Sequence, residues 1–345
     1  MLNVQKYLLE NSKDNGIDVA LSRLDVEFGI VSNKYPDRVV LNYGITTTKK
    51  FHPICDECRG LILGYPDVSI VLARSFDRFY NYGEYPQEVV NENFDINRSI
   101  AFDKIDGSLI NIYYDGNKWC CATRKMAFAE GKTVRGNSYK SLVDDALGYP
   151  VENIADIYNE VTIICELVSP ENRVVVPYKE KQLYLLAIRD KNGDYYSEDV
   201  VNDCANHLHI KRPKAYKFNS FDEIIKSAND LEPMNENGEG YICYDPVTQF
   251  RIKIKNAAYL ALHHLRDNGV VSDKRIASLV FGNDYAEYLN FFPEDREFFD
   301  PYIDAYDNML KDIKYVWNKT RWIESQKDFA LQVKDLSISG ILFQL

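Results

Sequence analysis

The pattern of apolar residues changes once along the chain, near Lys255, and this change limits the possible folds more than any other feature. Before Lys255, short runs rich in β-branched and aromatic residues lie between turn formers, a pattern typical of strands. After Lys255, apolar residues recur at helical spacing. We therefore predict a mixed α+β domain over residues 1–255 and a small helical domain over residues 256–345.

The individual elements are predicted from the same periodicities. Strands are predicted over residues 38–43, 60–63, 69–73, 108–114, 118–123, 161–168, 182–188, 240–244 and 249–254. Helices are predicted over residues 4–11, 140–146 and 221–228. In the tail, one helix runs from Asn256 to a stop at Asn268-Gly269. Asp300-Pro301 is expected to begin a long helix whose apolar stripe, which includes Leu310, is buried.

Charge and cysteine content narrow the function classes. The formal net charge of −11 argues against a protein that coats nucleic acid non-specifically, although cations gathered in one groove can still bind RNA. The seven cysteines are expected to be reduced thiols in a chain of this size. No apolar run is long enough for a membrane helix, and the N-terminus lacks a secretory pattern. We therefore expect a cytoplasmic protein without a membrane partner.

His52, Cys55 and Cys58 bring three possible zinc ligands close together in the sequence. A structural zinc site normally needs a fourth ligand, and usually a second paired motif supplies it. No such motif lies nearby. Buried thiols are therefore the favoured interpretation, and a zinc site stays open as the alternative.

The sharpest chemical signal is the segment from Lys104 to Ser108, which reads KIDGS and precedes a predicted strand. It joins a lysine to a tight turn whose backbone a phosphate can approach closely, so the lysine is a candidate nucleophile. The same residues could form an ordinary Asp-Gly hairpin turn, and the segment alone does not decide between the two.

Further residues follow in a fixed order and favour the chemical interpretation. Glu166 lies in a predicted buried strand, where an unpaired carboxylate is costly. Lys253 and Lys255 lie two apart in the last strand, so both side chains face one side and could meet the phosphates of one nucleotide. Arg59-Gly60 and Glu239-Gly240 complete the set. Salt bridges or solvent-reaching lysines could explain each residue separately, but they explain the ordered set poorly.

This ordered set resembles the motifs of covalent nucleotidyltransferases, the superfamily of polynucleotide ligases and mRNA capping enzymes. It is most similar to the RNA ligase 1 family of T-even bacteriophages, over roughly residues 40–265. The segments Glu57-Cys58-Arg59-Gly60 and Phe79-Tyr80-Asn81 add to this resemblance. DNA ligases of the superfamily generally carry Arg five residues after the lysine, where this chain has Leu109. The resemblance therefore implies a nucleotidyltransferase fold with antiparallel sheets and an RNA ligase.

The resemblance also implies how the central lysine reacts. Lys104 would attack the α-phosphate of ATP and form lysyl-AMP with release of pyrophosphate. Lys253 and Lys255 would repel its ammonium group and, together with a metal ion, depress its pKa. The same cations would stabilise the negative charge that develops on the phosphate.

Other matching residues are assigned to the metal and the nucleotide by the same resemblance. Mg²⁺, or Mn²⁺ in its place, is expected on Glu239 with Asp106 and Glu166. The residues expected to bind ATP are Arg59, Gly107, Glu166, Lys125, Arg78, Tyr43, Lys253 and Lys255. Arg78 departs from the family pattern, which has a lysine there, so its contact with phosphate would differ in geometry.

The implied function is an ATP-dependent RNA ligase that joins 5′-phosphate and 3′-hydroxyl ends through lysyl-AMP and adenylylated RNA. RNA repair, for example of a broken tRNA loop, is the expected role of a monomeric enzyme of this type, found in the host cytoplasm if viral. Residues 256–345 would form its RNA-specificity module.

Two alternative functions stay open. A GTP-dependent capping guanylyltransferase would use the same lysine, although such enzymes usually append a β-barrel. A non-catalytic relic would bind nucleotide or RNA without covalent transfer.

Overall fold

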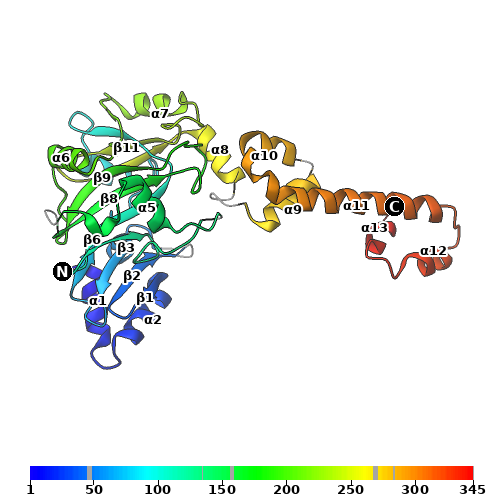
Figure 1. Ribbon diagram of the computed structural model, residues 1–345, viewed down its shortest axis with the longest axis horizontal. Coiled ribbons are helices and arrows are strands. Elements are labelled where there is room, and N and C mark those ends of the chain that lie inside the picture. The colour runs from blue at the N-terminus through cyan, green and yellow to red at the C-terminus, as the bar shows by residue number, and fades with distance from the viewer. Residues whose placement is uncertain (45–48, 134, 156–158, 267–270, 283, 345) are drawn as a thin grey trace. The chain divides into compact units, whose positions relative to one another are not determined.

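The computed structural model describes residues 1–345 except 45–48, 134, 156–158, 267–270, 283 and 345 (Figure 1). The chain divides into two compact units, Met1–His263 and His264–Leu345. This division lies beyond the boundary predicted at residue 255, because α8 (Ala257–Leu265) begins within the first unit. The Tyr259 hydroxyl in α8 donates a 2.6 Å hydrogen bond to Asp106, which ties the start of this helix to the first unit.

Sheet 1 lies at the N-terminal end of the first unit and is antiparallel with the order β1-β2-β3-β4. Its strands are β1 (Ile30–Lys34), β2 (Arg38–Tyr43), β3 (Arg59–Gly64) and β4 (Val71–Ala73). One face packs against the helices α1 (Asn3–Ser12), α2 (Ile17–Phe28) and α3 (Pro53–Glu57), which are blue in Figure 1. The other face packs through Val40 and Ile62 against Tyr113 and Ala122.

Sheet 2 forms the middle of the first unit, with the antiparallel order β7-β6-β8-β9. Its strands are β6 (Ser108–Tyr114), β7 (Trp119–Thr123), β8 (Val161–Val168) and β9 (Gln182–Asp190). Alternation along β8 places Ile163 and Cys165 in a core that α5 (Tyr139–Leu147) and α6 (Glu198–Leu208) cover. Glu166 therefore faces the opposite side of the sheet. A short 3-10 helix, Val151–Asn153, joins the covering layer.

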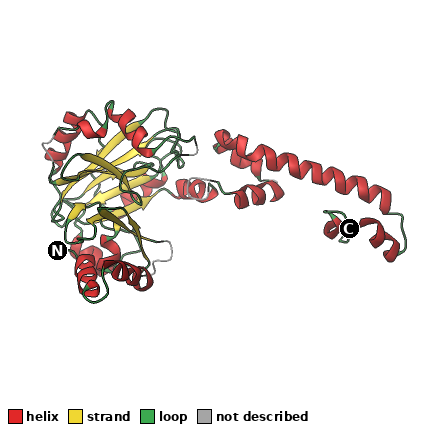
Figure 2. Ribbon diagram, turned by 60° about the horizontal axis from the view of Figure 1, so that its bottom comes forward, coloured by secondary structure: helices red, strands yellow, loops and turns green. Residues whose placement is uncertain are grey.

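Sheet 3 has the order β10-β5-β11-β12 and is also antiparallel. Figure 2 shows the strands of the first unit in yellow and the helices in red. Its strands are β5 (Ile100–Asp103), β10 (Ala215–Tyr216), β11 (Gly240–Tyr244) and β12 (Arg251–Lys255). Ile252 and Ile254 face a core that α4 (Gln87–Asn93) and α7 (Phe221–Asn229) cover. The alternate residues of β12 face the other side, as the period of two requires.

The second unit is helical, as predicted, and consists of α9 (Asp273–Gly282), α10 (Tyr285–Phe291), a 3-10 turn (Pro293–Asp295), α11 (Arg296–Thr320), α12 (Gln326–Val333) and α13 (Ser339–Leu342). The predicted start of the long helix at Asp300-Pro301 is wrong. Helix α11 continues directly from the 3-10 turn, so Pro301 lies inside it. Leu310 is 43% exposed, so the predicted stripe is only partly buried. No helix in the described residues is long and apolar enough to cross a membrane.

Candidate active site

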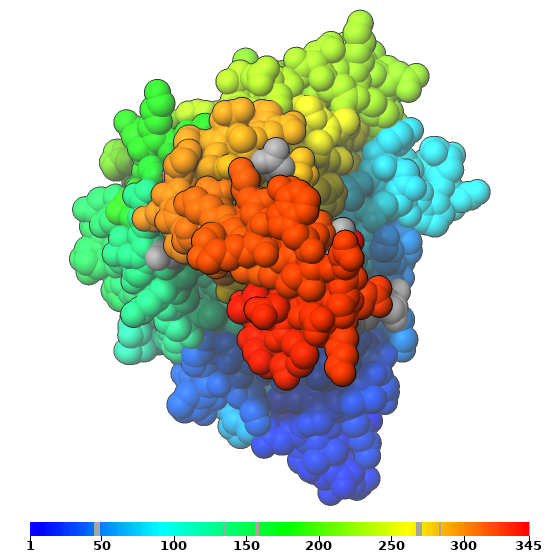
Figure 3. Space-filling view, turned by 90° about the vertical axis from the view of Figure 1, so that its right-hand side faces the viewer, coloured from blue at the N-terminus to red at the C-terminus, as the bar shows by residue number. Residues whose placement is uncertain are grey.

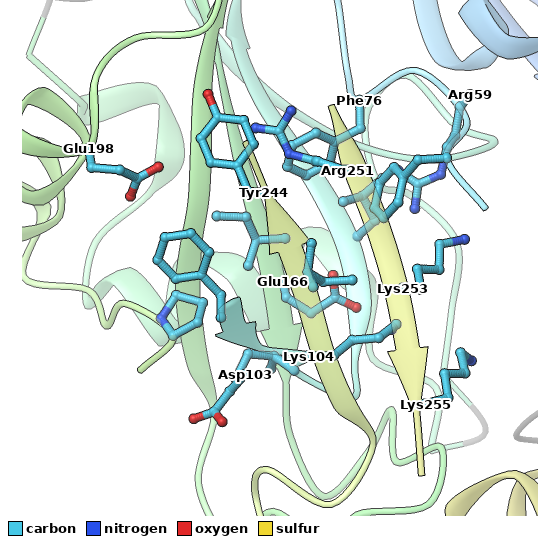
Figure 4. Close-up of a pocket in the computed structure, with 17 residues that line it drawn as sticks. Arg59, Phe76, Asp103, Lys104, Glu166, Glu198, Tyr244, Arg251, Lys253 and Lys255 are labelled. Carbon is cyan, nitrogen blue, oxygen red and sulfur yellow. The ribbon is translucent and has the colours of Figure 1, made fainter. Parts of the chain in front are cut away.

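A pocket lies between sheet 2 and sheet 3, and both sheets contribute side chains to it (Figure 4). Sheet 3 supplies its cationic side through Lys253 and Lys255, with Lys104 just beyond the end of β5. Sheet 2 supplies Glu166, and Arg59 at the start of β3 completes one end. Five of the predicted site residues therefore converge on one cavity, namely Arg59, Lys104, Glu166, Lys253 and Lys255.

A backbone hydrogen bond and an ion pair fix the position of Lys104. Its N–H donates to the carbonyl of Gly240 at 2.8 Å, which fixes the turn after β5 beside the start of β11. Its Nζ forms a 2.7 Å ion pair with Glu239, and the other oxygen of Glu239 lies 2.9 Å from Nζ of Lys255. Glu239 is almost fully buried and thus joins two predicted catalytic lysines.

The carboxylates around Lys104 shift its pKa in the direction opposite to the predicted one. Burial alone would lower the pKa of Lys104, but Glu239, Glu166 and Asp106 outweigh burial and raise it above the usual lysine value. The predicted depression of this pKa, by Lys253, Lys255 and a metal ion, is thus not found in the protein without nucleotide and metal. The physical reason is the 2.7 Å contact with Glu239, whose negative charge stabilises the protonated amine.

Lys253 is the lysine whose pKa the site depresses. Burial lowers its pKa to about 6, and the charges of Arg59, Lys104 and Lys255 add to this effect. Its Nζ lies 4.7 Å from the ring centroid of Phe79. Lys253 is therefore largely uncharged at neutral pH, although it faces the pocket beside Lys255 as predicted.

Glu166 lines the pocket and Glu239 contacts two of its lysines, but the two carboxyl groups differ in charge. Burial raises the pKa of Glu166 to about 8, against the attraction of Lys104. Burial would also raise the pKa of Glu239, but Lys104 and Lys255 outweigh it and hold the pKa below the usual value. Glu166 thus carries a proton at neutral pH and can donate as well as accept a hydrogen bond, for example with a ribose hydroxyl.

Asp106, predicted as a metal ligand, has a structural partner for each oxygen. One oxygen accepts the N–H groups of Val175 and Val176, both at 2.8 Å, and the other accepts the Tyr259 hydroxyl. The side chain is 3% exposed and does not line the pocket. Asp106 therefore connects the lysine loop to two distant segments, and the structure gives its predicted contact with metal no support.

Gly107, predicted to bind ATP, is required by the packing of the loop against sheet 2. A Cβ at this position would lie 2.3 Å from the carbonyl oxygen of Leu167, far inside contact distance. Gly107 itself does not line the pocket. Its place in the motif is explained by this close backbone approach, which sets the position of Lys104 three residues earlier.

Three arginines gather beside the pocket around Tyr43. The Cζ atoms of Arg78 and Arg124 lie 4.5 Å and 5.3 Å from the Tyr43 ring centroid. Arg59 packs over Phe79 at 5.6 Å. Nη1 of Arg59 and Nη1 of Arg78 are buried without a hydrogen-bond partner in the described part of the chain. Buried donors without acceptors are costly, so this cluster is suited to an anion.

Arg124 was missed by the sequence analysis, which chose its neighbour Lys125. Lys125 is exposed and does not line the pocket. The Cα atom of Arg124 would lie 3.1 Å from a Cβ placed on Gly60, so Arg124 packs directly on the predicted Arg59-Gly60 motif. A change of one residue after a strand changes the direction of the side chain, and sequence spacing alone could not resolve it.

Part of the pocket lining is apolar or aromatic, and these residues were not predicted from the sequence. They are Phe76, Phe102, Leu109, Leu186, Ile242 and Tyr244. Arg251 also lines the pocket, with its Cζ 4.8 Å from the Phe76 ring centroid and 4.1 Å from that of Tyr244. Glu198 lines it too and is paired with Arg212. Strand alternation gives the signal that could have found them, because Ile242 and Tyr244 share the pocket face of β11 with the side chains of β12. Aromatic and apolar side chains beside a few polar groups are suited to contact a flat base.

Metal-binding groups were tested against the same geometry. Within the described residues, no group of three His, Cys, Asp or Glu side chains could hold a metal ion. Cys55 and Cys58 are buried free thiols in the core below sheet 1, which gives the zinc alternative no support. Glu239 and Glu166 remain suitable oxygen donors beside Lys104. They fit an ion such as Mg²⁺, which keeps several waters and takes its remaining ligands from phosphates.

Comparisons with known proteins point to one family. A family model described as RNA ligase matches residues 57–259. A protein of Autographa californica nuclear polyhedrosis virus, named "Putative bifunctional polynucleotide kinase/RNA ligase", is 33% identical over 327 residues, which cover 88% of this chain and 44% of that protein. An RNA ligase of Rhodothermus phage RM378 is 26% identical over 350 residues, which cover 85% of this chain and 78% of that protein.

The solved structures include an archaeal ATP-dependent RNA ligase that aligns over 94% of this chain and 76% of that chain. The two are 12% identical, with a TM-score of 0.49. The chain spans less than half the length of the baculovirus protein that it matches.

Proposed function

Because the chain belongs to the RNA ligase family of the T4 RNA ligase 1 type, we propose that it is an ATP-dependent RNA ligase with Lys104 as its nucleophile. The observation that carries the proposal is the ion-pair chain in which buried Glu239 joins Lys104 to Lys255. Glu166 and Lys253 face the same pocket. A lysine among acids and further cations is suited to covalent transfer of a nucleotide.

The first step transfers AMP to the protein. ATP binds with its base against the apolar and aromatic residues of the pocket and with its α-phosphate at Lys104. Lys104 first gives up a proton to water, and its neutral amine then attacks the α-phosphorus and loses a second proton to water. A P–N bond forms, the bond to the β-phosphate oxygen breaks, and pyrophosphate leaves with the electron pair. Breaking the ion pair with Glu239 favours this step, because that contact raises the pKa of Lys104.

Lys253, Lys255 and Arg59 stabilise the phosphates in this step. Their side chains line the pocket on the side of sheet 3 and at the start of β3. The anion raises the pKa of Lys253, which then gains a proton and a charge beside the phosphate. Arg78 and Arg124 offer donors to the outer phosphates or to the leaving pyrophosphate.

A divalent cation, Mg²⁺ or Mn²⁺, belongs to this proposal as a cofactor. Glu239 would hold it, with Glu166 as the second carboxylate, while Asp106 keeps its structural partners. When bound, such an ion would neutralise phosphate charge. Glu239 would then exchange its contact with Lys104 for the ion.

The second and third steps join RNA ends. The 5′-phosphate of an RNA strand attacks the lysyl-AMP phosphorus, the P–N bond breaks, and Lys104 recovers its amine. A 3′-hydroxyl then attacks the RNA phosphate, loses its proton and releases AMP.

A broken loop such as that of a tRNA is a suitable substrate, and the role proposed for the protein is RNA repair as a cytoplasmic monomer. Residues 256–345 are proposed to carry RNA specificity, since the chemistry is confined to the first unit.

The test incubates the protein with Mg²⁺ and α-labelled ATP or GTP, and then with 5′-phosphorylated RNA or DNA strands. We expect a covalent adduct from ATP, its loss in Lys104→Ala, and joining of RNA. An adduct from GTP alone would favour a capping guanylyltransferase. Nucleotide binding without an adduct from folded protein would favour a non-catalytic relative.

A further inference from the structure

The second half of α11 has a charge opposite to that of the rest of the protein. Residues 308–322 carry the cations Lys311, Lys314, Lys319 and Arg321 against one acid, Asp312. The preceding residues 296–307 carry four acids and one cation, and the whole chain has a net charge of −11. A cationic segment in an acidic protein concentrates attraction for anions in one place.

The two faces of this half of α11 have different surroundings. Met309, Ile313, Val316 and Trp317 pack against the cluster formed with α12 and α13. Lys311, Lys314 and Lys319 lie on the remaining face of the helix, because they recur at spacings of three to five residues. Arg321 follows directly after the end of the helix. Residues coloured orange to red in Figure 3 form the surface of this part of the second unit.

Two large aromatic rings beside these cations are exposed instead of packed in the core. Tyr315 is 61% exposed, and Trp322, just after the helix, is 74% exposed. Nζ of Lys319 lies 4.2 Å from the Tyr315 ring centroid, and Cζ of Arg321 lies 4.5 Å from the Trp322 ring centroid. Each exposed ring therefore has a cation against it. The apolar cluster beneath already contains Trp317, so burial does not explain these rings.

The cations of this face are not used in ion pairs. Among the described residues, no salt bridge involves Lys311, Lys314, Lys319 or Arg321, whereas the acidic half of α11 holds the pair Arg296–Asp300. The helix dipole favours cations only in the last turn, which accounts for Lys319 but not for Lys311 or Lys314.

We propose that this face binds single-stranded RNA, which would be the substrate strand if the proposed ligase function holds. The surface, called here the basic aromatic face, consists of Lys311, Lys314, Tyr315, Lys319, Arg321 and Trp322. Its cations contact phosphates, and its two rings stack on exposed bases. An acidic peptide would match the charge but would leave the rings exposed to water.

The experiment measures binding of a fluorescent 12-nucleotide single-stranded RNA by anisotropy, with the full chain and without ATP. We expect the double variant Tyr315→Ala/Trp322→Ala to bind at least ten-fold more weakly, since each lost stack weakens binding by on the order of ten-fold. We expect Lys314→Gln/Arg321→Gln to lower the slope of log affinity against log salt by about 1.4, the value for two lost single-strand phosphate contacts.

Phe281→Ala is the matched control, because Phe281 is also 61% exposed but lies on α9. It should bind RNA like the parent protein, and all variants should form the Lys104 adduct with ATP at the parent rate. RNA affinity of the double aromatic variant within two-fold of the parent would overturn the proposal. So would equal binding of a polyglutamate peptide. Absence of the adduct in the parent protein would instead remove the ligase function, and RNA binding would be judged separately.

Discussion

At the scale of single residues, the pocket assigns unlike charges to lysines that look equivalent in the sequence. Lys104 is paired with Glu239 and has a raised pKa, whereas the pKa of Lys253 is lowered to about 6. Lys253, the lysine that is neutral in the free protein, is thus not the proposed nucleophile. Binding of a triphosphate must therefore move protons within the site, and this movement can be measured.

Lys253 gives a prediction for proton uptake. Its pKa of about 6 leaves it uncharged at pH 7.5, and an adjacent phosphate raises the pKa, so the protein should take up a proton when it binds ATP. Calorimetry in buffers of different ionisation enthalpy measures this uptake. Lys253→Arg keeps a permanent charge and should bind ATP without this proton. Uptake that persists unchanged in Lys253→Arg would contradict the assignment.

Arg124 and Lys125 are adjacent and give a matched pair of substitutions. Arg124 packs beside Tyr43 and Arg59, whereas Lys125 is exposed. Loss of a charged donor to phosphate costs roughly 1.5–3 kcal/mol, so Arg124→Ala should weaken ATP binding by on the order of ten- to a hundred-fold. Lys125→Ala should change it by less than two-fold. Equal losses in both variants, measured from the ATP dependence of adduct formation, would contradict the placement of Arg124 instead of Lys125 at the nucleotide.

At the scale of elements, the loop between β5 and β6 depends on residues far away in the sequence. Asp106 accepts hydrogen bonds from residues that are 69, 70 and 153 positions distant. Gly107 lies against the backbone of β8. The position of Lys104 is therefore set by the assembly of two sheets and α8, and the local motif alone does not set it.

Gly107→Ala should destabilise the protein through the clash with Leu167. The added Cβ would lie 2.3 Å from a backbone oxygen, which cannot move without disturbing β8. We expect a loss of roughly 1–3 kcal/mol in the free energy of unfolding, measured with urea. Gly340→Ala is the control, because a Cβ there meets nothing within 4 Å. Equal stability of the two variants would contradict this account of the glycine.

Most strands were predictable because their alternation is local. Predicted strands at 38–43, 108–114, 161–168 and 240–244 agree with β2, β6, β8 and β11 to the residue. The sequence analysis missed β5, which is only four residues long and ends in Asp103. It also missed α2, although Gly16 and Gly29 bound it with positive φ angles. A strand of four residues such as β5 spans too few repeats of the two-residue alternation to be recognised.

The candidate site was predictable where one strand carries two of its residues, as with Lys253 and Lys255. It was not predictable where the role depends on long-range partners. Asp106 looked like a metal ligand because its bonds to Val175, Val176 and Tyr259 leave no local pattern. The charge state of Lys104 depends likewise on Glu239, which is distant in sequence.

At the scale of the whole molecule, the two units divide the proposed work. The pocket and its ion pairs lie within Met1–His263, whereas the basic aromatic face lies within His264–Leu345. Tyr259 belongs to the first unit although it follows the last strand. The end of a functional first unit should therefore lie after Tyr259, and truncation can locate it.

Two truncations test this boundary. A chain of residues 1–263 keeps the Tyr259–Asp106 hydrogen bond and should form the lysyl adduct with ATP. A chain of residues 1–255 loses that partner, which leaves a buried carboxylate oxygen unsatisfied at a cost of roughly 1–3 kcal/mol, and should be less stable and less active. Unfolding curves and adduct yields of both chains give the answer. Equal behaviour would place the boundary at residue 255 instead.

The central claim is that AMP is transferred to Lys104, and peptide mapping by mass spectrometry after incubation with ATP and Mg²⁺ tests it most directly. The account predicts AMP on Lys104 alone, even though Lys253 is the neutral lysine of the free protein. It also predicts that the modification is lost in Lys104→Ala and does not move to a neighbour. AMP on Lys253, or an unmodified chain under these conditions, would contradict the claim.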